Sequence, residues 1–186
     1  MVLLRTILDQ GRFLRRFVRN RDGVSAVEFA MILPFMLTLY LGGVELGDGL
    51  AIQFRATLAA RTVTDLASQY ISINNATMNS ILGAASTVVA PYSGANIVVT
   101  LSEVTTNSSG QGKVVWSDSL NGTARTVGSN VTLPSNLQTA NITLLFGEVT
   151  YPYTPTLGYV VTGTINLYEQ MYFYPRLSAT VTRINS

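Results

Sequence analysis

The feature that most constrains this chain is residues 24–44, VSAVEFAMILPFMLTLYLGGV, a stretch of 21 residues whose only charged side chain is Glu28. An α-helix needs about 20 consecutive apolar residues to cross the hydrocarbon core of a bilayer. The stretch is long enough. It also exceeds the apolar region of an ordinary secretory signal, and no small-x-small cleavage site follows it. We therefore predict one transmembrane helix over residues 24–45.

The charged residues on the two sides of this stretch differ in sign. Six of the twelve basic residues precede Gly23, whereas Glu45 and Asp48 follow the stretch. Basic flanks stay on the cytoplasmic side of a membrane. The pattern predicts a basic cytoplasmic leader over residues 1–23 and a single-pass protein with residues 46–186 outside the cytoplasm. Beyond the leader, acidic residues outnumber basic ones, so the calculated pI of 9.0 describes the leader alone.

Composition excludes several classes of function. A nucleic-acid-binding face would need a basic stripe with interleaved aromatic side chains, and the sequence has none. The chain contains no Cys and no His, which removes thiol chemistry, disulfides, the commonest zinc sites and the Ser–His triad. We predict no enzymatic activity, no catalytic residue, no metal site and no cofactor. The acidic residues of the exported part are interpreted as scattered, solvated strand residues: Glu103, Asp118, Glu148 and Glu169.

Glu28 is the unusual residue of the apolar stretch. A carboxylate at the centre of a transmembrane helix costs about 2.5–3.5 kcal/mol, and less near an end, so it indicates a function by default. The alternative is that Glu28 lies one turn inside the cytoplasmic interface and extends its carboxylate to the lipid headgroups. Position alone does not decide between these interpretations.

The residues around Glu28 favour a function. Residues 23–29, GVSAVEF, resemble the class III signal at which type IV pilin-like proteins are processed. More narrowly, GVSAVEFAMILPF resembles the TadE-like family, the minor pseudopilins of the tight-adherence (Tad/Flp) pilus system. The resemblance implies that a membrane aspartyl prepilin peptidase cuts after Gly23 and that Val24 becomes the new N-terminus. It also implies that Glu28, followed by Phe29, is the acid at the fifth mature position and that Pro34 is the family's proline.

Physical reasons support each of these roles. Glycine lets the backbone of the scissile bond approach an active site closely. Glu28 lies one helical turn from the Val24 ammonium that cutting would create, and negative charge is favoured near a helix N-terminus. Its carboxylate can therefore pair with that ammonium in its own or an adjacent subunit and align the helices. Pro34 lacks an N–H and should bend or loosen the helix, either as a tolerated feature or for bundle packing.

The resemblance implies a non-enzymatic minor pseudopilin of the bacterial inner membrane that primes or tips a Tad pilus used for surface adhesion. Its expected partners are the prepilin peptidase, other pilin and pseudopilin subunits, the inner-membrane pilus platform and membrane lipid, with no nucleic acid. Its C-terminal domain would be periplasmic or enter the extracellular pilus. Two alternatives stay open. One is an uncleaved, TadG-like anchor of the same machine, and the other is a membrane-tethered periplasmic binding module with a tyrosine-rich sheet as its site.

The helix is expected to continue into an exported helical stalk over residues 46–90. One apolar face recurs at three-to-five-residue intervals and would pack on the globular domain or form a filament contact: Leu50, Phe54, Leu58, Val63, Leu66 and Tyr70. Asn74 and Asn75 break this pattern. A shorter helix is predicted over residues 78–89, ended by Pro91, with these side chains inward: Ile81, Leu82, Ala85 and Val89.

Short β-branched runs alternate with turn residues after Pro91, which is typical of an antiparallel sheet. We predict strands over residues 96–104, 113–119, 141–151, 164–174 and 178–184, in a β-rich domain spanning residues 91–186. The fold class is therefore α+β, a pilin-like lollipop with a long N-terminal helix, a short helix and a sheet. A dense aromatic cluster is assigned to the core and to strand pairing, with a surface for a partner as the alternative: Tyr151, Tyr153, Tyr159, Tyr168, Tyr172, Phe173 and Tyr174.

Overall fold

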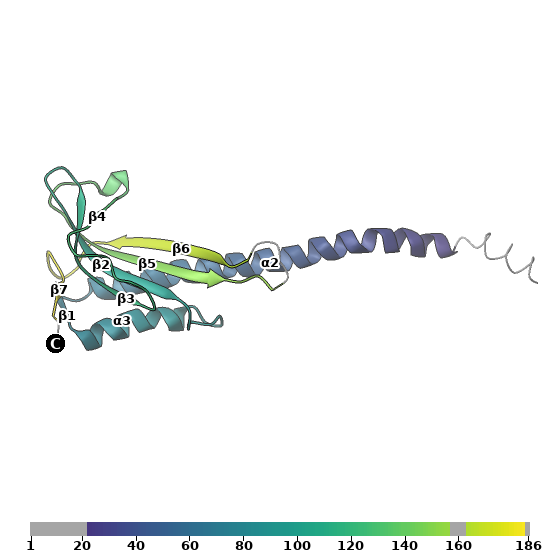
Figure 1. Cartoon of the computed structure of the whole chain (residues 1–186), viewed down its shortest axis with the longest axis horizontal. Helices are drawn as coiled ribbons and strands as arrows, with labels where there is room; N and C mark the ends of the chain where they lie inside the picture. Colours follow the sequence, from purple (N-terminus) through teal and green to yellow (C-terminus); the bar gives the residue numbers. More distant parts are fainter. Residues whose placement is uncertain (1–21, 157–162, 185–186) are drawn as a thin grey trace, which may run out of the picture. The chain divides into compact units, whose positions relative to one another are not determined.

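The computed structural model describes residues 22–156 and 163–184 (Figure 1). Tyr159 and almost all of the predicted leader lie outside the described residues. The fold is α+β, as predicted, with a long apolar helix, a second helix and an antiparallel sheet. The chain divides into two units, residues 1–44 and residues 45–186, and each is described by itself.

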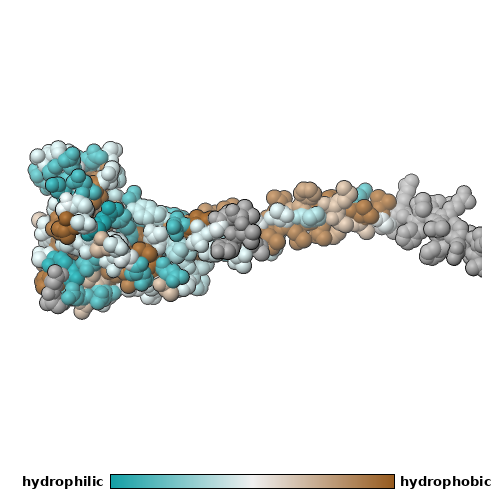
Figure 2. Space-filling model, in the orientation of Figure 1, coloured by the Kyte–Doolittle hydropathy of each residue, from teal (hydrophilic) through white to brown (hydrophobic). Residues whose placement is uncertain are grey.

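The first unit contains the start of helix α2 (Asp22–Ser68), a single helix of 47 residues that continues into the second unit. It is described from Asp22 onward and passes through Pro34 without ending. Among the described residues it is the one helix long and apolar enough to cross a membrane. Almost every side chain from Gly23 to Val44 is exposed, and Figure 2 shows mainly hydrophobic residues over this part of the helix. The structure thus has one candidate membrane span, at the predicted place.

The second part of α2 packs on the sheet through small side chains. Its buried residues are Ile52, Ala56, Ala59, Ala60, Val63, Thr64, Ala67 and Ser68. Packing of the predicted apolar face on the globular domain is wrong for its first three members, since Leu50, Phe54 and Leu58 are 63%, 70% and 38% exposed. The alternative, a filament contact, stays a prediction. It is also wrong for Tyr70, which is 41% exposed, whereas Val63 is buried and Leu66 is partly buried.

The close approach of helix and sheet explains this error. A Cβ added to Gly147 would lie 1.9 Å from the Thr64 hydroxyl and 3.3 Å from the Ala60 carbonyl oxygen. Only alanine-sized or β-branched side chains fit at so short a separation, and larger ones would force the layers apart. Leu50, Phe54 and Leu58 therefore lie away from this contact, whereas Ile52 is buried before it.

Helix α3 (Asn75–Val88) confirms the predicted short helix. It starts earlier than predicted because Asn74 is its N-cap, and the Asn74 side chain accepts a hydrogen bond of 2.8 Å from the Thr77 N–H. Asn74, predicted to break the helical pattern, is thus the residue that starts α3. The predicted inward residues are buried, together with Met78.

The main sheet has five antiparallel strands in the order β4-β3-β2-β5-β6. Their bounds are β2 (Val98–Thr106), β3 (Gly112–Leu120), β4 (Asn130–Val131), β5 (Thr143–Tyr153) and β6 (Ile165–Phe173). Four of the five predicted strands are therefore present within a few residues. Strand β4 and the short 3-10 helix η1 (Ser135–Leu137) were not predicted.

Both faces of the sheet carry apolar residues. The larger core lies between the sheet and the two helices and includes Leu101, Trp116 and Val149. A smaller cluster contains Val104, Val114, Val131, Leu133, Leu144 and Phe146. In the β2–β3 register Glu103 pairs with Trp116 and Val104 with Val114, which leaves Val115 as a bulge. The bulge lets Trp116 join the larger core while Val114 joins the smaller one.

The last predicted strand, over residues 178–184, is wrong in length and in pairing. The structure has only β7 (Thr182–Arg183), which pairs in parallel with β1 (Ser72–Ile73). Backbone and side-chain groups hold this tail in place. Trp116 Nε1 donates a 2.7 Å hydrogen bond to the Val181 carbonyl, and the Val181 N–H donates one of 2.6 Å to Glu103. These bonds are long range in sequence, so the local pattern could not reveal them.

Candidate functional site

The predicted processing and docking residues all lie on the first part of α2. Val24 and Phe29 are 54% and 58% exposed, and no atom lies within 4 Å of a Cβ added to Gly23. Glu28 is exposed and follows Val24 by about one turn, so both residues are on the same helix face. Within the described residues Glu28 makes no ion pair. Its carboxylate is therefore available to a group outside this unit.

The Gly23–Val24 bond lies within the described part of α2. Since an extended backbone is expected at a protease, a cut at this bond would require the helix to open locally there.

Pro34 lies inside the helix and is followed one turn later by Thr38. The Thr38 hydroxyl donates a 2.8 Å hydrogen bond to the Pro34 carbonyl oxygen. This contact adds a side-chain donor to the Pro34 carbonyl oxygen, whereas the carbonyl that loses its helical donor at proline is that of Ala30.

Beyond the predicted span, α2 exposes a row of large apolar residues, here called the apolar strip. It consists of Leu46, Leu50, Phe54 and Leu58, which are 65%, 63%, 70% and 38% exposed. Spacing by four residues places them on one helix face. The core of the second unit does not include them.

These features of α2 coincide with a match to a known family. Residues 23–65 match the model of the TadE-like protein family. The N-terminal part of the chain is TadE-like. The resemblance based on GVSAVEFAMILPF is thereby confirmed, and it links the chain to the Tad pilus system. The match contains all five predicted site residues and the apolar strip, and it ends before the sheet. No curated protein and no solved structure matches the chain.

Outside the TadE-like segment, the four acidic residues assigned to solvent are each bonded. Glu103 is only 2% exposed, and burial raises its pKa while the Val181 N–H opposes that rise. Asp118 pairs with Arg183 at 2.8 Å, and Glu148 pairs with Arg125 at 2.5 Å. Glu169 accepts a hydrogen bond from Gln53. The interpretation as solvated strand residues is therefore wrong, since the carboxylates join distant segments.

The tyrosine-rich segment is divided between several places. The Tyr168 hydroxyl donates a 2.6 Å hydrogen bond to Glu148, and burial together with this bond raises the pKa of Tyr168. Tyr172 stacks on Phe146 with ring centroids 4.5 Å apart. Tyr151 is in the larger core. Strand pairing and core packing, as predicted, thus account for these three residues.

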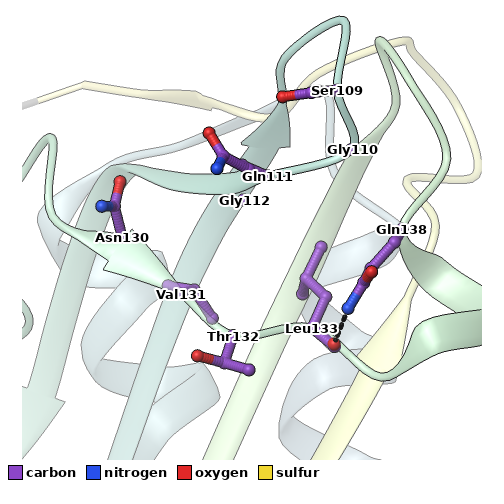
Figure 3. Close-up of a pocket in the computed structure, with 9 residues that line it drawn as sticks. All are labelled: Ser109, Gly110, Gln111, Gly112, Asn130, Val131, Thr132, Leu133 and Gln138. Atoms are coloured by element: carbon purple, nitrogen blue, oxygen red, sulfur yellow. Dashed lines mark hydrogen bonds between the residues drawn. The ribbon is translucent and has the colours of Figure 1, made fainter.

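A first cleft, of about 240 Å³, lies beside β4 and the segment that leads to η1 (Figure 3). The amide side chains of Gln111, Asn130 and Gln138 line it, and Gln138 donates a 2.8 Å hydrogen bond to the Leu133 carbonyl oxygen. Gly110 has φ of +78° and a Cβ there would lie 2.4 Å from the Gln138 carbonyl oxygen, so the backbone needs glycine. The lining holds no ionisable side chain. Its groups can hydrogen-bond a neutral polar molecule but cannot exchange a proton with it.

A second cleft, of about 310 Å³, combines aromatic and acidic residues of the second unit. Its lining consists of Asp48, Ile52, Tyr92, Tyr151, Pro152, Tyr153, Thr154 and Thr156. The sequence identified Asp48 as a charge after the span and the tyrosines as a cluster, but it did not predict that they line one cleft. No group of three or more potential metal-binding side chains occurs among the described residues.

Proposed function

We propose that this chain is a minor pseudopilin of a Tad pilus, held in the bacterial inner membrane by α2 and used to prime or tip the filament. In this proposal the leader is cytoplasmic, a membrane aspartyl prepilin peptidase cuts after Gly23, and the β-rich domain is periplasmic. The chain performs no catalysis. Its partners are other pilin and pseudopilin subunits and the inner-membrane platform.

The observation that carries this proposal is the apolar strip. A helix of about 20 residues already spans the hydrocarbon core, so large apolar residues further along α2 gain no burial from lipid tails. Leu50 and Phe54 nonetheless stay exposed on the second unit. Burial of a Leu or Phe side chain stabilises by about 1.5–3 kcal/mol, so a helix of a partner subunit has a favourable surface here. A helix that only anchors the chain in the membrane would not need an exposed apolar strip beyond the span.

Glu28 supplies the complementary contact inside the membrane. After cutting, the Val24 ammonium and the Glu28 carboxylate are two charges in a medium of low dielectric constant, where attraction between them is strong. Pairing within one subunit or between subunits would offset the desolvation of both groups. This contact would fix the register of neighbouring helices.

The decisive experiment is N-terminal sequencing of the protein from its native membrane, with and without the prepilin peptidase. The proposal expects a mature chain that starts at Val24 only when the peptidase is present. Gly23→Val should leave the precursor uncut, because a side chain there crowds the scissile backbone. An intact N-terminus in a piliated wild-type strain would instead establish the uncleaved, TadG-like anchor.

Cutting and assembly can be separated with a second variant. Glu28→Gln keeps the size of the side chain but removes its charge. We expect the variant to be inserted and at least partly processed, yet to recruit partner subunits poorly and to support few pili. Normal piliation by Glu28→Gln would show that the carboxylate only reaches the headgroups.

The strip can be probed by cross-linking because the chain contains no cysteine. Phe54→Cys should form disulfide or short cross-linked products with pilus subunits that carry a matching cysteine. Val127→Cys is a control, since Val127 is also well exposed, at 65%, but lies on the sheet domain. Equal cross-linking from both positions would remove the support that the strip gives to the proposal.

The cleft of Figure 3 favours the second candidate, a membrane-tethered binding module. Its neutral amide lining suits a polar, uncharged ligand such as a saccharide. A glycan screen of the full chain in detergent tests this function, with Asn130→Ala as the variant that should lose binding. A screen in which no glycan binds would leave the pseudopilin as the supported function.

A further inference from the structure

The second cleft, here called the tyrosine cleft, is built by three segments of the second unit. Asp48 and Ile52 come from α2, Tyr92 comes from the turn after α3, and the remaining lining residues come from the end of β5 and the chain just beyond it. Residues 151 and 153 of β5 lie on the same face of the sheet because side chains alternate along a strand. The cleft therefore places three phenol rings beside one face of α2.

Gly49, near the start of this part of α2, leaves space for a tyrosine ring. A Cβ added to Gly49 would lie 3.4 Å from Cε1 of Tyr153, so the ring packs against the glycine in ordinary van der Waals contact. Tyr151 is 8% exposed and belongs to the larger core. The floor of the cleft is thus buried, while its Asp48 side is exposed.

The cleft has an acidic character. The Tyr153 hydroxyl donates 3.2 Å hydrogen bonds to the Glu45 backbone and side-chain oxygens, and the Thr156 N–H donates one of 3.2 Å to the Glu45 carboxylate. Burial raises the pKa of Tyr153, and the negative charges of Glu45 and Asp48 raise it further. No basic residue lines the cleft. The local potential is therefore negative.

Several acceptors of the cleft have no protein partner. Among residues 22–156 and 163–184, Asp48 forms no ion pair. The Tyr92 and Tyr151 hydroxyls of the lining make no hydrogen bond to a described residue. Since no buried side-chain oxygen there lacks a partner, both hydroxyls reach solvent. A positively charged ligand surrounded by N–H or C–H groups would contact a carboxylate, phenol oxygens and aromatic faces in this cleft. Aromatic faces attract such a cation electrostatically.

We propose that the tyrosine cleft binds an alkylammonium group, supplied by the headgroup of a zwitterionic membrane lipid. The argument for a lipid is position along the chain. Asp48 lies about one helical turn beyond residue 44, the end of the apolar stretch, and tyrosines are enriched where a span meets the headgroups. An anionic headgroup would be repelled by Glu45 and Asp48. The proposal rests on the membrane segment and is independent of the pseudopilin function.

Lipid retention by the full chain in detergent micelles tests this proposal. Native mass spectrometry would compare phosphatidylethanolamine, phosphatidylcholine and phosphatidylglycerol with identical acyl chains. We expect the two ammonium lipids to be retained in preference to phosphatidylglycerol. Asp48→Asn should weaken that retention about fivefold, the scale of one lost charge contact beside aromatic rings. Asp48→Glu, which keeps the charge, should restore most of it.

Tyr92→Leu tests the aromatic part, with Tyr174→Leu as its matched control because Tyr174 is exposed and outside the cleft. Only Tyr92→Leu should lower retention, and circular dichroism would verify that both variants fold. Equal retention of all three lipids, or unchanged retention by Asp48→Asn, would overturn the proposal. Binding of free phosphoethanolamine as tightly as of the lipid would overturn the assignment to a membrane source. Cutting after Gly23 should be the same in every variant, so a failure here does not affect the pseudopilin function.

Discussion

The two parts of α2 use apolar residues in opposite ways. Before residue 45 the helix exposes large side chains such as Phe29 and Leu39, at 58% and 77%, and buries none. After residue 45 it buries small ones, such as Ala56 and Ala60, and still exposes large ones such as Phe54. The comparison teaches that the size of an apolar residue in this helix does not indicate the core. Most large apolar residues of α2 are exposed, and most residues that face the sheet are small, with Ile52 as a buried exception.

The largest expected effect comes from closing the space between α2 and the sheet. Gly147→Val would place side-chain atoms where the Thr64 hydroxyl now lies, 1.9 Å from the position of a Cβ. Overpacking of this kind costs about 1–3 kcal/mol, and more where backbone must move, so we expect a loss of about 3 kcal/mol or more in the free energy of unfolding. Thermal unfolding of the full chain in detergent measures it.

Gly83→Ala is the matched control for that substitution. Gly83 lies inside α3 with no atom within 4 Å of an added Cβ. Alanine is favoured over glycine in a helix by about 0.5–1 kcal/mol, so this variant should be equally or more stable. If Gly147→Val unfolded at the wild-type temperature, the close packing of small residues on the sheet would be disproved.

A second prediction tests the buried face of α2 directly. Ala60 is fully buried, and Ala60→Leu should cost about 1–3 kcal/mol because the core has no room for three more carbon atoms. Ala51, on the exposed side of the same helix, provides the control, and Ala51→Leu should change the free energy of unfolding by less than about 0.5 kcal/mol. Chemical denaturation of both variants would distinguish the faces. Similar losses would mean that the faces are misassigned.

These residues also show how far the sequence could lead. The span, the second helix and four strands follow from hydropathy, periodicity and turn residues. Gly23, Val24, Glu28, Phe29 and Pro34 follow from a motif that is contiguous in sequence and lies on one helix. The inward face of α2 could not be predicted, because its burial is decided by Gly147, a residue far along the chain. Periodicity identifies apolar faces but does not say whether a sheet, a lipid or a partner covers them.

The tyrosine cleft and the carboxylate contacts escaped prediction for the same reason. Glu103 was assigned to solvent because the acidic residues of the exported part are scattered along the sequence. Its partner, the Val181 N–H, belongs to a tail whose parallel pairing with β1 has no local signature. Asp48 and Tyr92 likewise come together only through the arrangement of α2, α3 and β5.

The third prediction concerns Glu103, which is buried in the second unit, whereas the described first part of α2 buries no side chain. Burial raises the pKa of Glu103 above its ordinary value of 4.5. The folded protein therefore holds this proton more tightly than the unfolded chain. The stability from this group is fully present below pH 4.5 and is lost as pH rises through the raised pKa.

Glu103→Gln should remove that dependence while its side-chain oxygen still accepts the bond from Val181. The free energy of unfolding of the variant, relative to wild type, should therefore rise between pH 4 and pH 8. Unfolding midpoints measured across this range would show the trend. A difference that stays constant with pH would mean that Glu103 is not titrated in this way.

The smallest effect on the stability of the isolated subunit is expected for a substitution of Phe54. Phe54 is 70% exposed, so Phe54→Ala removes little buried area and should change the free energy of unfolding by less than about 0.5 kcal/mol. The same substitution removes the largest side chain of the apolar strip, so co-purification with pilus subunits should fall. Phe29→Ala, on the membrane part, is the parallel variant because Phe29 is exposed to a similar degree. If Phe54→Ala lowered the stability of the subunit as much as Ala60→Leu does, the strip would belong to the core, and the two parts of α2 would not differ in the way proposed.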